Sequence, residues 1–538
     1  MAFVSSPVQS PTQPKTMSVL PWLGLGLVAL IGLVHVPFPF SGDQALFALS
    51  AREMANGEVL YRDFWDMKQP ATFIFYYLGS LLFGNSEVGI RSFEWLYMMG
   101  FACFLVTVLK RRFQHAVPLA LLPILTVGLY YSVSPSLLLT QAEAIVGVPI
   151  FGLIWCFQKA LEARRKWLWL FIAGILGSIV LCFKLIFLIF LFPIFVVSLF
   201  KVARSCPQQQ KYPTVSVASL PSLGLTMVQV AVPLLCGLLL PWLVMLGYFY
   251  SQESLEIVYK TFLVYPPMVV SGDGPDKDWF RFVKSLGYFL AAFASAVLLG
   301  SLQGYRVVRR ADDLLTLNLV LWAVGGLLVI WLQSQGWWPY YYLLLFIPFG
   351  TLAALFLNRR WTALTALWTT PEGTPLALRR SVLVIGSCLL LLVPAMGLGV
   401  KSLWLLKSGL ALQPEQRLQY QMLIQDDYKI SLDEIALISK PDSQTGDIFV
   451  MGNPLIYYLS GRNQAGPING WSLEWLMPFQ WKELEQQLIT YKPVYIFVDH
   501  TYQWLLAEKG TDILEMMQQN YTQLNESDTG IWYEAISQ

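Results

Sequence analysis

The chain has 538 residues, of which 56% are hydrophobic and only 13% are charged, far more apolar side chain than a soluble core of this length needs. This composition excludes an ordinary soluble globular protein and predicts a mostly α-helical, polytopic membrane protein. The formal net charge of +2 is too small to indicate a nucleic-acid partner. The basic residues instead lie in short clusters between apolar segments, as orientation signals do.

Residues 1–17 are polar and rich in Pro, Ser and Gln, which predicts a disordered cytoplasmic tail. The apolar segment that follows lacks a small-residue cleavage pattern, so we expect a retained first span rather than a removed signal peptide. From there to residue 404 the sequence predicts about eleven crossings, each of roughly 20 apolar residues. They lie at 18–36, 88–109, 116–133, 143–158, 167–183, 185–200, 227–250, 283–304, 314–332, 338–357 and 381–404.

The tendency of basic loops to stay in the cytoplasm settles two ambiguous segments. Residues 71–84 are apolar but short, and placing Lys15 and the cluster at 110–112 on one side requires that this segment does not cross. The run 167–200 would be about 50 Å long as one helix, too long for a bilayer core of about 30 Å. We therefore expect it to cross twice and to turn at Lys184, on the outer face. The loop at 37–87 then also lies outside.

The C-terminal part, residues 405–538, has a different composition and is mostly polar. Short β-type apolar runs alternate with helical patterns, which predicts a small α/β domain on the outer face. The runs lie at 448–451 and 494–498, and the helical patterns near 415–438, 473–490 and 501–519. No Gly-rich phosphate loop is present, so we assign no nucleotide to it and expect a lid or scaffold over the membrane site.

The segment 41–70 holds an unusual concentration of charge for so apolar a chain. Ser41 followed three residues later by Gln44 is a capping-box pattern, so a helix is predicted to begin there with Asp43 in its first turn. Apolar residues at helical spacing predict that this helix lies flat on the bilayer, with polar residues such as Gln44 and Ser50 facing away. The helix dipole stabilises a carboxylate in the first turn, which would explain Asp43 without any function.

A second charged group, Asp66 and Lys68, follows in the same loop just before Pro70. A carboxylate and an ammonium at a membrane surface suit the transfer of a group from a lipid phosphate. The fixed cation stabilises the negative charge that grows on the phosphate oxygen as its bond breaks. The carboxylate accepts the proton of the attacking hydroxyl.

The order of residues in this loop resembles the first outer loop of the GT-C glycosyltransferases, in particular bacterial relatives of the lipid A aminoarabinose transferase and the protein O-mannosyltransferases. The residues that carry the resemblance are Asp43, Arg52-Glu53-Met54 with Gly57, an acidic residue and Lys68 before Pro70, then Gly84 and Arg91. The resemblance implies a GT-C membrane domain over residues 18–404, whose outer loop at 37–87 carries the active site. It also implies that Asp43 is the catalytic carboxylate and that Lys68 belongs to the phosphate site.

Two further residues match the family less specifically. Glu143 stands where many members have a second acidic residue, and Lys184 stands before an apolar run, as a Lys often does in the family. Each also has a purely structural explanation, since Glu143 begins a helix and a Lys in a hairpin can snorkel to the interface. The chain departs from the family in having Gln44 where a Glu is common, and Asp66 two places from Lys68. The aromatic run at 337–342 is expected to be a membrane-interface belt rather than a sugar or polyprenyl contact.

We therefore expect an inverting glycosyltransferase in a bacterial cytoplasmic membrane. It would move a sugar from a polyprenyl-phosphate-linked donor to a lipid, glycan or protein acceptor at the outer face, surrounded by membrane lipids. Asp43 is the expected base, Lys68 and Lys184 hold the donor phosphate, and Asp66 and Glu143 orient these groups or bind a divalent metal. The alternatives are a membrane transporter or lipid flippase, and an assembly protein without catalytic activity. Ionisable groups gather at the outer rim rather than near the midplane, which favours surface chemistry.

Overall fold

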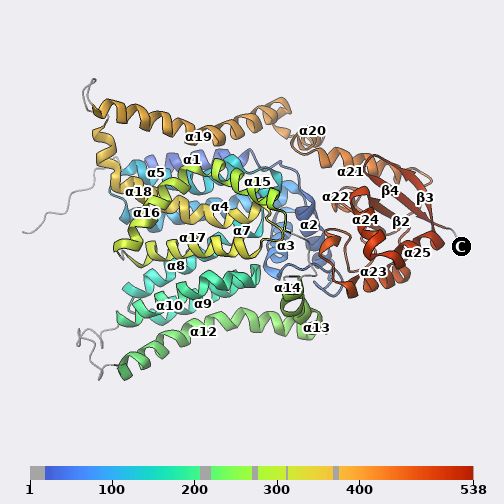
Figure 1. Ribbon diagram of the computed structural model, residues 1–538, viewed down its shortest axis with the longest axis horizontal. Helices are drawn as coiled ribbons and strands as arrows, with labels where there is room; N and C mark the ends of the chain where they lie inside the picture. Colours follow the sequence, from blue (N-terminus) through green and yellow to red (C-terminus); the bar gives the residue numbers. More distant parts are fainter. Residues whose placement is uncertain (1–18, 206–219, 270–276, 311–312, 368–374, 537–538) are drawn as a thin grey trace, which may run out of the picture.

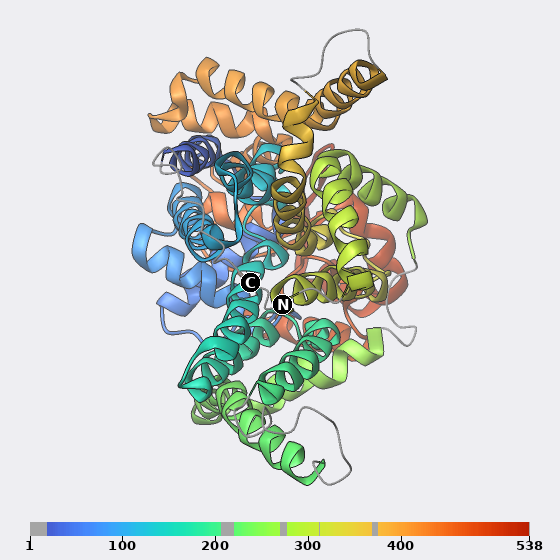
Figure 2. The same ribbon diagram turned by 90° about the vertical axis from the view of Figure 1, so that its left-hand side faces the viewer.

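The structure, a computed structural model, describes residues 19–205, 220–269, 277–310, 313–367 and 375–536. The tail predicted over residues 1–17 lies outside these ranges. The molecule consists of a bundle of apolar helices and a smaller α/β domain that stands at one end of the bundle (Figure 1). Seen from the opposite end, the bundle helices lie in front of this domain (Figure 2).

The membrane part contains helices of very different lengths. They are α1 (Leu20–Leu33), α2 (Gly42–Ala55), α3 (Pro70–Phe83), α4 (Glu87–Leu109), α5 (Ala116–Pro123), α6 (Leu129–Val133), α7 (Ala142–Ile145), α8 (Gly147–Glu162), α9 (Lys166–Phe183), α10 (Leu188–Arg204), α12 (Leu220–Ser251), α13 (Leu255–Tyr259), α14 (Tyr265–Met268), α15 (Trp279–Ala292), α16 (Ala294–Arg310), α17 (Leu314–Leu332), the 3₁₀ helix η9 (Pro339–Leu345), α18 (Phe346–Ala366) and α19 (Pro375–Lys407).

Nine helical segments in the described ranges are long and apolar enough to cross a membrane, and a tenth arises if α15 and α16 count as one span bent by 84°. Helix α1, with 14 residues, is shorter than these. Many large apolar side chains on the bundle are exposed, for example Leu30 on α1 and Leu243 on α12, as expected of helices that contact lipid. The predicted class of helical, polytopic membrane protein is confirmed, and the count of eleven crossings stays a prediction.

The predicted turn at Lys184 is confirmed. Helix α9 ends at Phe183, Lys184 takes an extended conformation, and α10 begins at Leu188. The Lys166 ammonium at the start of α9 donates a hydrogen bond of 3.1 Å to the Ser205 carbonyl just after α10, so α10 returns to the end of the bundle where α9 begins. The run 167–200 therefore forms two helices, as its excessive length for one span indicated.

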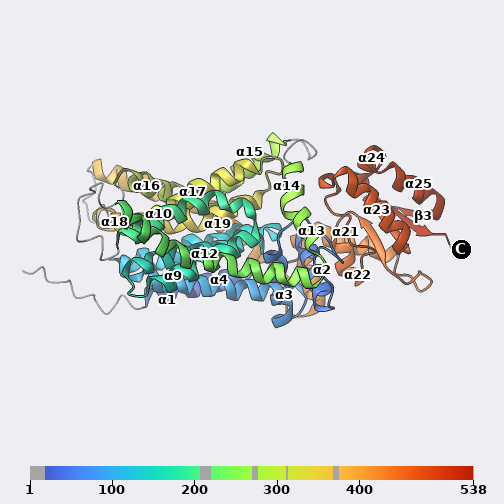
Figure 3. The same ribbon diagram turned by 90° about the horizontal axis from the view of Figure 1, so that it is seen from below.

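Basic loops meet at the end of the bundle away from the α/β domain. Arg112, after α4, forms an ion pair of 2.8 Å with Asp313, before α17. The Asn358 amide on α18 donates to the Arg112 carbonyl at 3.2 Å. Figures 1 and 3 place α16 and α18 at this end, and α2, α3, α13 and α14 at the end that faces the domain.

Helix α2 begins as predicted. The backbone N–H of Ser41 donates to the Gln44 side chain at 3.0 Å, which completes a capping box and places Asp43 in the first turn. The prediction that the polar side of α2 faces away from the protein is wrong for Gln44 and Ser50, since both are buried. The Gln44 side chain bonds to Arg91, Ser136 and Leu139 of the membrane part. The orientation of α2 relative to the bilayer stays a prediction.

The two sides of α2 pack against different parts of the chain. Phe47 packs edge-on against Phe73 of α3, with ring centroids 5.5 Å apart. On the other side Leu49 belongs to a buried apolar cluster with Ile448 and Val450 of the C-terminal domain. The helix that carries Asp43 is thus clamped between the two parts of the molecule.

The C-terminal domain is a four-stranded sheet with helices. Its strands are β1 (Ile448–Met451), β2 (Tyr495–Asp499), β3 (Tyr521–Glu526) and β4 (Gly530–Ala535), and its helices are α20 (Pro414–Ile424), α21 (Asp426–Leu437), α22 (Leu455–Ser460), α23 (Pro478–Tyr491), α24 (His500–Lys509) and α25 (Thr511–Asn520). The strand order is β1-β2-β4-β3, with β1 and β2 parallel and the other two pairs antiparallel. The sequence predicts β1, β2 and the helical regions of α20–α21, α23 and α24–α25, but it misses α22, β3 and β4. Most side chains of β3 are exposed and give it no apolar pattern.

Candidate active site

Asp43, Asp66 and Lys68 come together where α2 begins and α3 is about to begin. The Lys68 ammonium lies 3.9 Å from Asp43 Oδ1 and 3.6 Å from Asp66 Oδ2. The Lys68 backbone N–H also donates to Asp66 Oδ1 at 2.8 Å, so the short Asp-Met-Lys turn fixes both side chains. The structure therefore brings the two charged groups of the first loop into one cluster.

The charge of Lys68 is set by these neighbours. Burial lowers the pKa of the Lys68 ammonium, but the carboxylates of Asp43, Asp66 and Glu143 outweigh it and hold the pKa above its ordinary value. Lys68 is therefore a permanent cation at physiological pH. A permanent cation next to a carboxylate favours the ionised form of that carboxylate, which is the form a general base needs.

Glu143 and Lys184 form a second pair. Glu143 lies in the first turn of the short helix α7, and its Oε1 accepts a hydrogen bond of 2.6 Å from the Lys184 ammonium. The same ammonium donates to the Gln333 side chain at 3.1 Å and lies 4.7 Å from the ring centroid of Tyr341. Lys184 is thus held by three elements rather than left to snorkel freely into the interface.

The two pairs lie near each other. Glu143 acts electrostatically on Lys68, and the charges of Asp43, Asp66 and Glu143 all act on Tyr340. The rings of Tyr340 and Tyr341 are themselves in contact, with centroids 5.1 Å apart. Part of the aromatic run expected to form a membrane belt therefore lies between the two charged pairs.

The C-terminal domain supplies a residue that the sequence analysis missed. The indole N–H of Trp471 donates to Asp43 Oδ1 at 2.8 Å, and the Trp471 backbone N–H donates to Asn469 Oδ1 at 3.0 Å. The indole ring lies against Gly42, where an added Cβ would come within 2.6 Å of ring carbon Cζ2. The only sign of this contact in the sequence is Gly42, just before Asp43. A glycine indicates that another group packs closely there, but it does not identify that group.

A buried polar network in the membrane part holds the start of α2 in place. Arg91 on α4 donates to the Gln44 side chain at 2.6 Å and lies 3.6 Å from Glu94. The Gln44 amide donates to the carbonyls of Ser136 at 2.9 Å and Leu139 at 2.5 Å. A glutamate could not donate these two bonds, so an amide side chain suits this position.

The acidic residues of the site do not form a metal centre in the part of the chain that the structure describes. No group of three or more His, Cys, Asp or Glu side chains there is placed to hold an ion. Asp43 and Asp66 share Lys68, whereas Glu143 faces Lys184. Each carboxylate thus faces a lysine ammonium, which does not fit a shared metal, and no chemical step below depends on one.

Comparison with known proteins supports the predicted resemblance. The family model described as dolichyl-phosphate-mannose-protein mannosyltransferase matches residues 68–235. The fold is similar to that of ArnT from Cupriavidus metallidurans, solved bound to undecaprenyl phosphate, with a TM-score of 0.58, 14% identity, and coverage of 97% of this chain and 99% of that chain. No curated protein sequence matches the chain.

Two structures of the Archaeoglobus fulgidus oligosaccharyltransferase are also similar. The apo form has a TM-score of 0.50 at 12% identity, covering 95% of this chain and 73% of that chain. The form in complex with Zn and sulfate has a TM-score of 0.45 at 13% identity, covering 93% and 71%. The similarity to ArnT and to the apo oligosaccharyltransferase shows that the chain has the fold of the GT-C membrane glycosyltransferases, as predicted.

Proposed function

We propose that the chain is a glycosyltransferase that moves a sugar from a polyprenyl-phosphate-linked donor to an acceptor hydroxyl, with inversion at the anomeric carbon. The observation that carries this is the pairing of Lys68 with Asp43, at 3.9 Å, at the end of a GT-C bundle. ArnT, solved with undecaprenyl phosphate, supports the class of donor. No comparison favours the alternative of a transporter or lipid flippase.

The residues divide the reaction between them. The acceptor oxygen forms a bond to the anomeric carbon while the bond from that carbon to the phosphate oxygen breaks, and polyprenyl phosphate leaves with the electron pair. Asp43 takes the proton of the acceptor hydroxyl, and one displacement inverts the anomeric centre. Lys68 and Lys184 stabilise the charge that develops on the departing phosphate.

Asp66 and Glu143 act as positioning groups in this proposal. Each holds a lysine by a charged contact, Asp66 at 3.6 Å from Lys68 and Glu143 at 2.6 Å from Lys184. The donor phosphate, whose two non-bridging oxygens share one negative charge, competes with these carboxylates for the ammonium groups. We assign no role to a divalent metal, although one distant relative has been solved with zinc.

We further propose that the site faces the outside of a bacterial cytoplasmic membrane, with the N-terminus in the cytoplasm. The support is the basic cluster at 110–112, which lies at the opposite end of the bundle, where Arg112 contacts Asp313 and Asn358. The positive-inside rule places such a cluster in the cytoplasm. Residues 18–404 then form the membrane domain, with the active-site loop at 37–87. Residues 405–538 form the outer domain.

The substitution Asp43→Asn tests the assignment of the base. The amide keeps the shape of the carboxylate but cannot take a proton, so sugar transfer falls by about 10²- to 10⁴-fold. Transfer is measured in membranes supplied with a labelled polyprenyl-phosphate sugar, with protein level checked by immunoblot. The control is Asp433→Asn, an exposed residue on α21. Full activity of Asp43→Asn overturns the assignment.

A further inference from the structure

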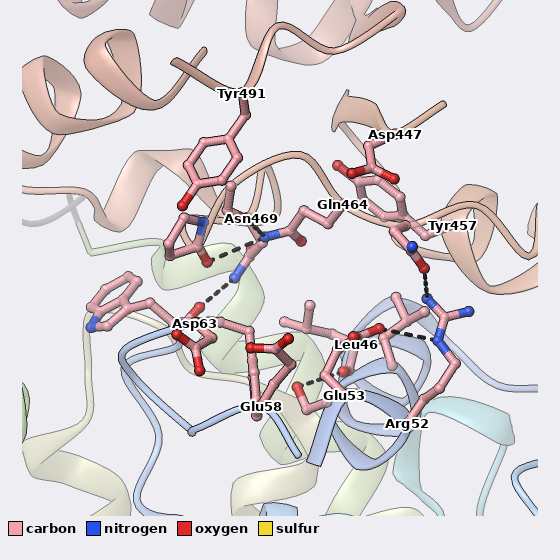
Figure 4. A pocket seen from close by; sticks show the side chains of 17 residues that line it. Leu46, Arg52, Glu53, Glu58, Asp63, Asp447, Tyr457, Gln464, Asn469 and Tyr491 are labelled. Carbon is pink, nitrogen blue, oxygen red and sulfur yellow. Dashed lines mark hydrogen bonds and ion pairs between the residues drawn. The ribbon is translucent and has the colours of Figure 1, made fainter. Parts of the chain in front are cut away.

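A cavity of about 390 Å³ lies between the first loop and the C-terminal domain, beside the Asp43 site rather than over it. Asp447 and Tyr491 of the domain line one side, whereas Glu58 and Asp63 of the loop and Leu46 of α2 line the other (Figure 4). This volume is at the small end of ligand sites, which run from about 300 to 1,000 Å³, and it accommodates a ligand of small size. The proposed reaction assigns nothing to this space.

The walls of the cavity are joined by backbone hydrogen bonds. The backbone N–H of Trp65 in the first loop donates to the Pro467 carbonyl of the domain at 2.8 Å. In return the Asn469 side chain donates to the Trp65 carbonyl at 2.9 Å. All three residues line the cavity. A space bounded by paired backbone is part of the native structure rather than an accidental gap between two domains.

Asp43 does not line the cavity, but two of the wall residues connect to it. Leu46 stands on α2 one helical turn after Asp43. Asn469 accepts the backbone N–H of Trp471, and the indole of Trp471 donates to Asp43. Neither Lys68 nor Lys184 lines the cavity, so a molecule bound there is separate from the lysines that face the donor phosphate.

The charge of the cavity is opposite to that of the phosphate site. Its lining contains four carboxylates and a single guanidinium, Arg52, which is paired with Glu53 at 3.1 Å. Asp63 is held by Arg62 at 2.8 Å, which lowers the pKa of Asp63 to about 2. Its hydrogen bond with Glu58 raises the pKa of Glu58 above the usual value. The Asp447 carboxylate, by contrast, forms no hydrogen bond within the described part of the chain.

These charges select against an anion and in favour of hydroxyl donors. A phosphate entering the cavity would be repelled by the carboxylates that line it. Carboxylates are strong acceptors for hydroxyl groups, and the 53% exposed ring of Tyr491 offers a flat apolar face beside them. Acceptor oxygens together with an aromatic face fit a sugar ring.

We propose that this cavity binds the acceptor, and that the acceptor is an uncharged glycan whose terminal hydroxyl extends to Asp43. The proposal rests on the proposed function and adds the substrate class to it. It assigns the two substrates to sites of opposite charge: the anionic donor lies on Lys68 and Lys184, and the neutral acceptor lies against Asp447, Glu58 and Tyr491. Separate electrostatic environments keep a donor phosphate from occupying the acceptor position.

The test uses the purified full-length chain in lipid nanodiscs with a labelled undecaprenyl-phosphate sugar. The acceptors are a panel of neutral oligosaccharides, the same panel bearing phosphate groups, and a Ser- and Thr-rich peptide. We expect transfer to members of the neutral panel. Asp447→Lys and Tyr491→Ala raise the acceptor KM about tenfold, as for a contact worth about 1.4 kcal/mol, with the donor KM unchanged. The matched control is Glu508→Lys, an exposed acid on α24.

The outcomes separate the two proposals. Consumption of donor with transfer only to peptide or to phosphorylated glycan overturns the acceptor assignment, as does hydrolysis of donor with no transfer. Transfer to neutral glycan with both variants behaving like Glu508→Lys also overturns the cavity as its site. A wild-type chain that consumes no donor under any condition overturns the proposed function itself. Because Asp447 and Tyr491 are exposed, both variants are expected to fold, and circular dichroism checks this.

Discussion

At the scale of single residues, Asp43 is held through one oxygen and left free at the other. Trp471 donates to Oδ1 at 2.8 Å, and the Lys68 ammonium also lies nearest Oδ1, at 3.9 Å. In the part of the chain that the structure describes, Oδ2 has no hydrogen-bond donor. This division leaves Oδ2 to receive the proton, while the bond from Trp471 fixes the direction of the carboxylate.

The substitution Trp471→Phe removes this bond and keeps a ring against Gly42. A hydrogen bond to a charged group contributes about 1.5 to 3 kcal/mol, so kcat falls by about ten- to a hundredfold while the donor KM stays nearly constant. The anion also loses stabilisation, so the acidic limb of the plot of kcat against pH moves to higher pH. Trp504→Phe, at a 61% exposed position, is the control. A fall in activity with no shift of the acidic limb indicates a purely structural role.

The first loop could be predicted from the sequence because its chemistry is local. Asp43, Asp66 and Lys68 are close in the chain, so a capping box and a tight turn suffice to bring them together. Trp471 is 428 positions away from Asp43, and no local pattern connects the two. The pair of Glu143 and Lys184 was partly predictable. The predicted topology placed both residues at the outer end of the bundle, but it did not predict that they form an ion pair.

At the scale of elements, α2 depends on the polar network beneath its first turn. Arg91 and Glu94 are both 1% exposed, and Arg91 also donates to the Pro39 carbonyl just before the helix, at 3.0 Å. Glu94 accepts bonds from Thr140, including one of 2.6 Å from its hydroxyl, so both charged groups have polar partners as well as each other. A buried pair of this kind costs desolvation but strongly penalises the loss of either partner.

Arg91→Met therefore leaves Glu94 as an unpaired buried charge. The free energy of unfolding falls by about 3 to 5 kcal/mol, measured by thermal or denaturant unfolding in detergent. The double variant Arg91→Met with Glu94→Gln removes the unpaired charge and recovers part of this loss. Equal destabilisation by the single and double variants contradicts the interpretation of Arg91 and Glu94 as a charge pair.

The elements themselves were largely predictable, and their surroundings were not. The apolar run up to Lys184 and beyond it is too long for one span, so length alone predicted the hairpin of α9 and α10. The sequence predicted α2 at the correct residues, but its amphipathic pattern was interpreted as a helix lying on a membrane surface. The face that carries Leu49 instead packs on Ile448 of a domain about 400 positions later, and hydropathy does not distinguish lipid from protein.

At the scale of the whole molecule, the proposed active site lies at the junction of the helical bundle and the C-terminal domain. Glu87, at the start of α4, accepts hydrogen bonds from Tyr428 at 2.5 Å and from Tyr458 at 3.1 Å, one residue on α21 and one on α22. The Tyr428 hydroxyl in turn accepts the backbone N–H of Phe40 at 3.0 Å, just before α2. The Glu87 carboxylate therefore connects the bundle, the C-terminal domain and the start of α2, the helix that carries Asp43.

Removing this carboxylate tests whether docking controls the site. In Glu87→Ala the hydroxyls of Tyr428 and Tyr458 lose a charged acceptor, and each such bond contributes about 1.5 to 3 kcal/mol. Local opening of the junction then becomes more frequent, so amide hydrogen exchange in α2, α21 and α22 accelerates by at least about tenfold, whereas α9 and α10 stay protected. The double variant Tyr428→Phe with Tyr458→Phe removes the same two bonds from the domain side and should reproduce this pattern. Faster exchange throughout the bundle would instead mean that Glu87 stabilises the membrane helices and has no special part in holding the domain over Asp43.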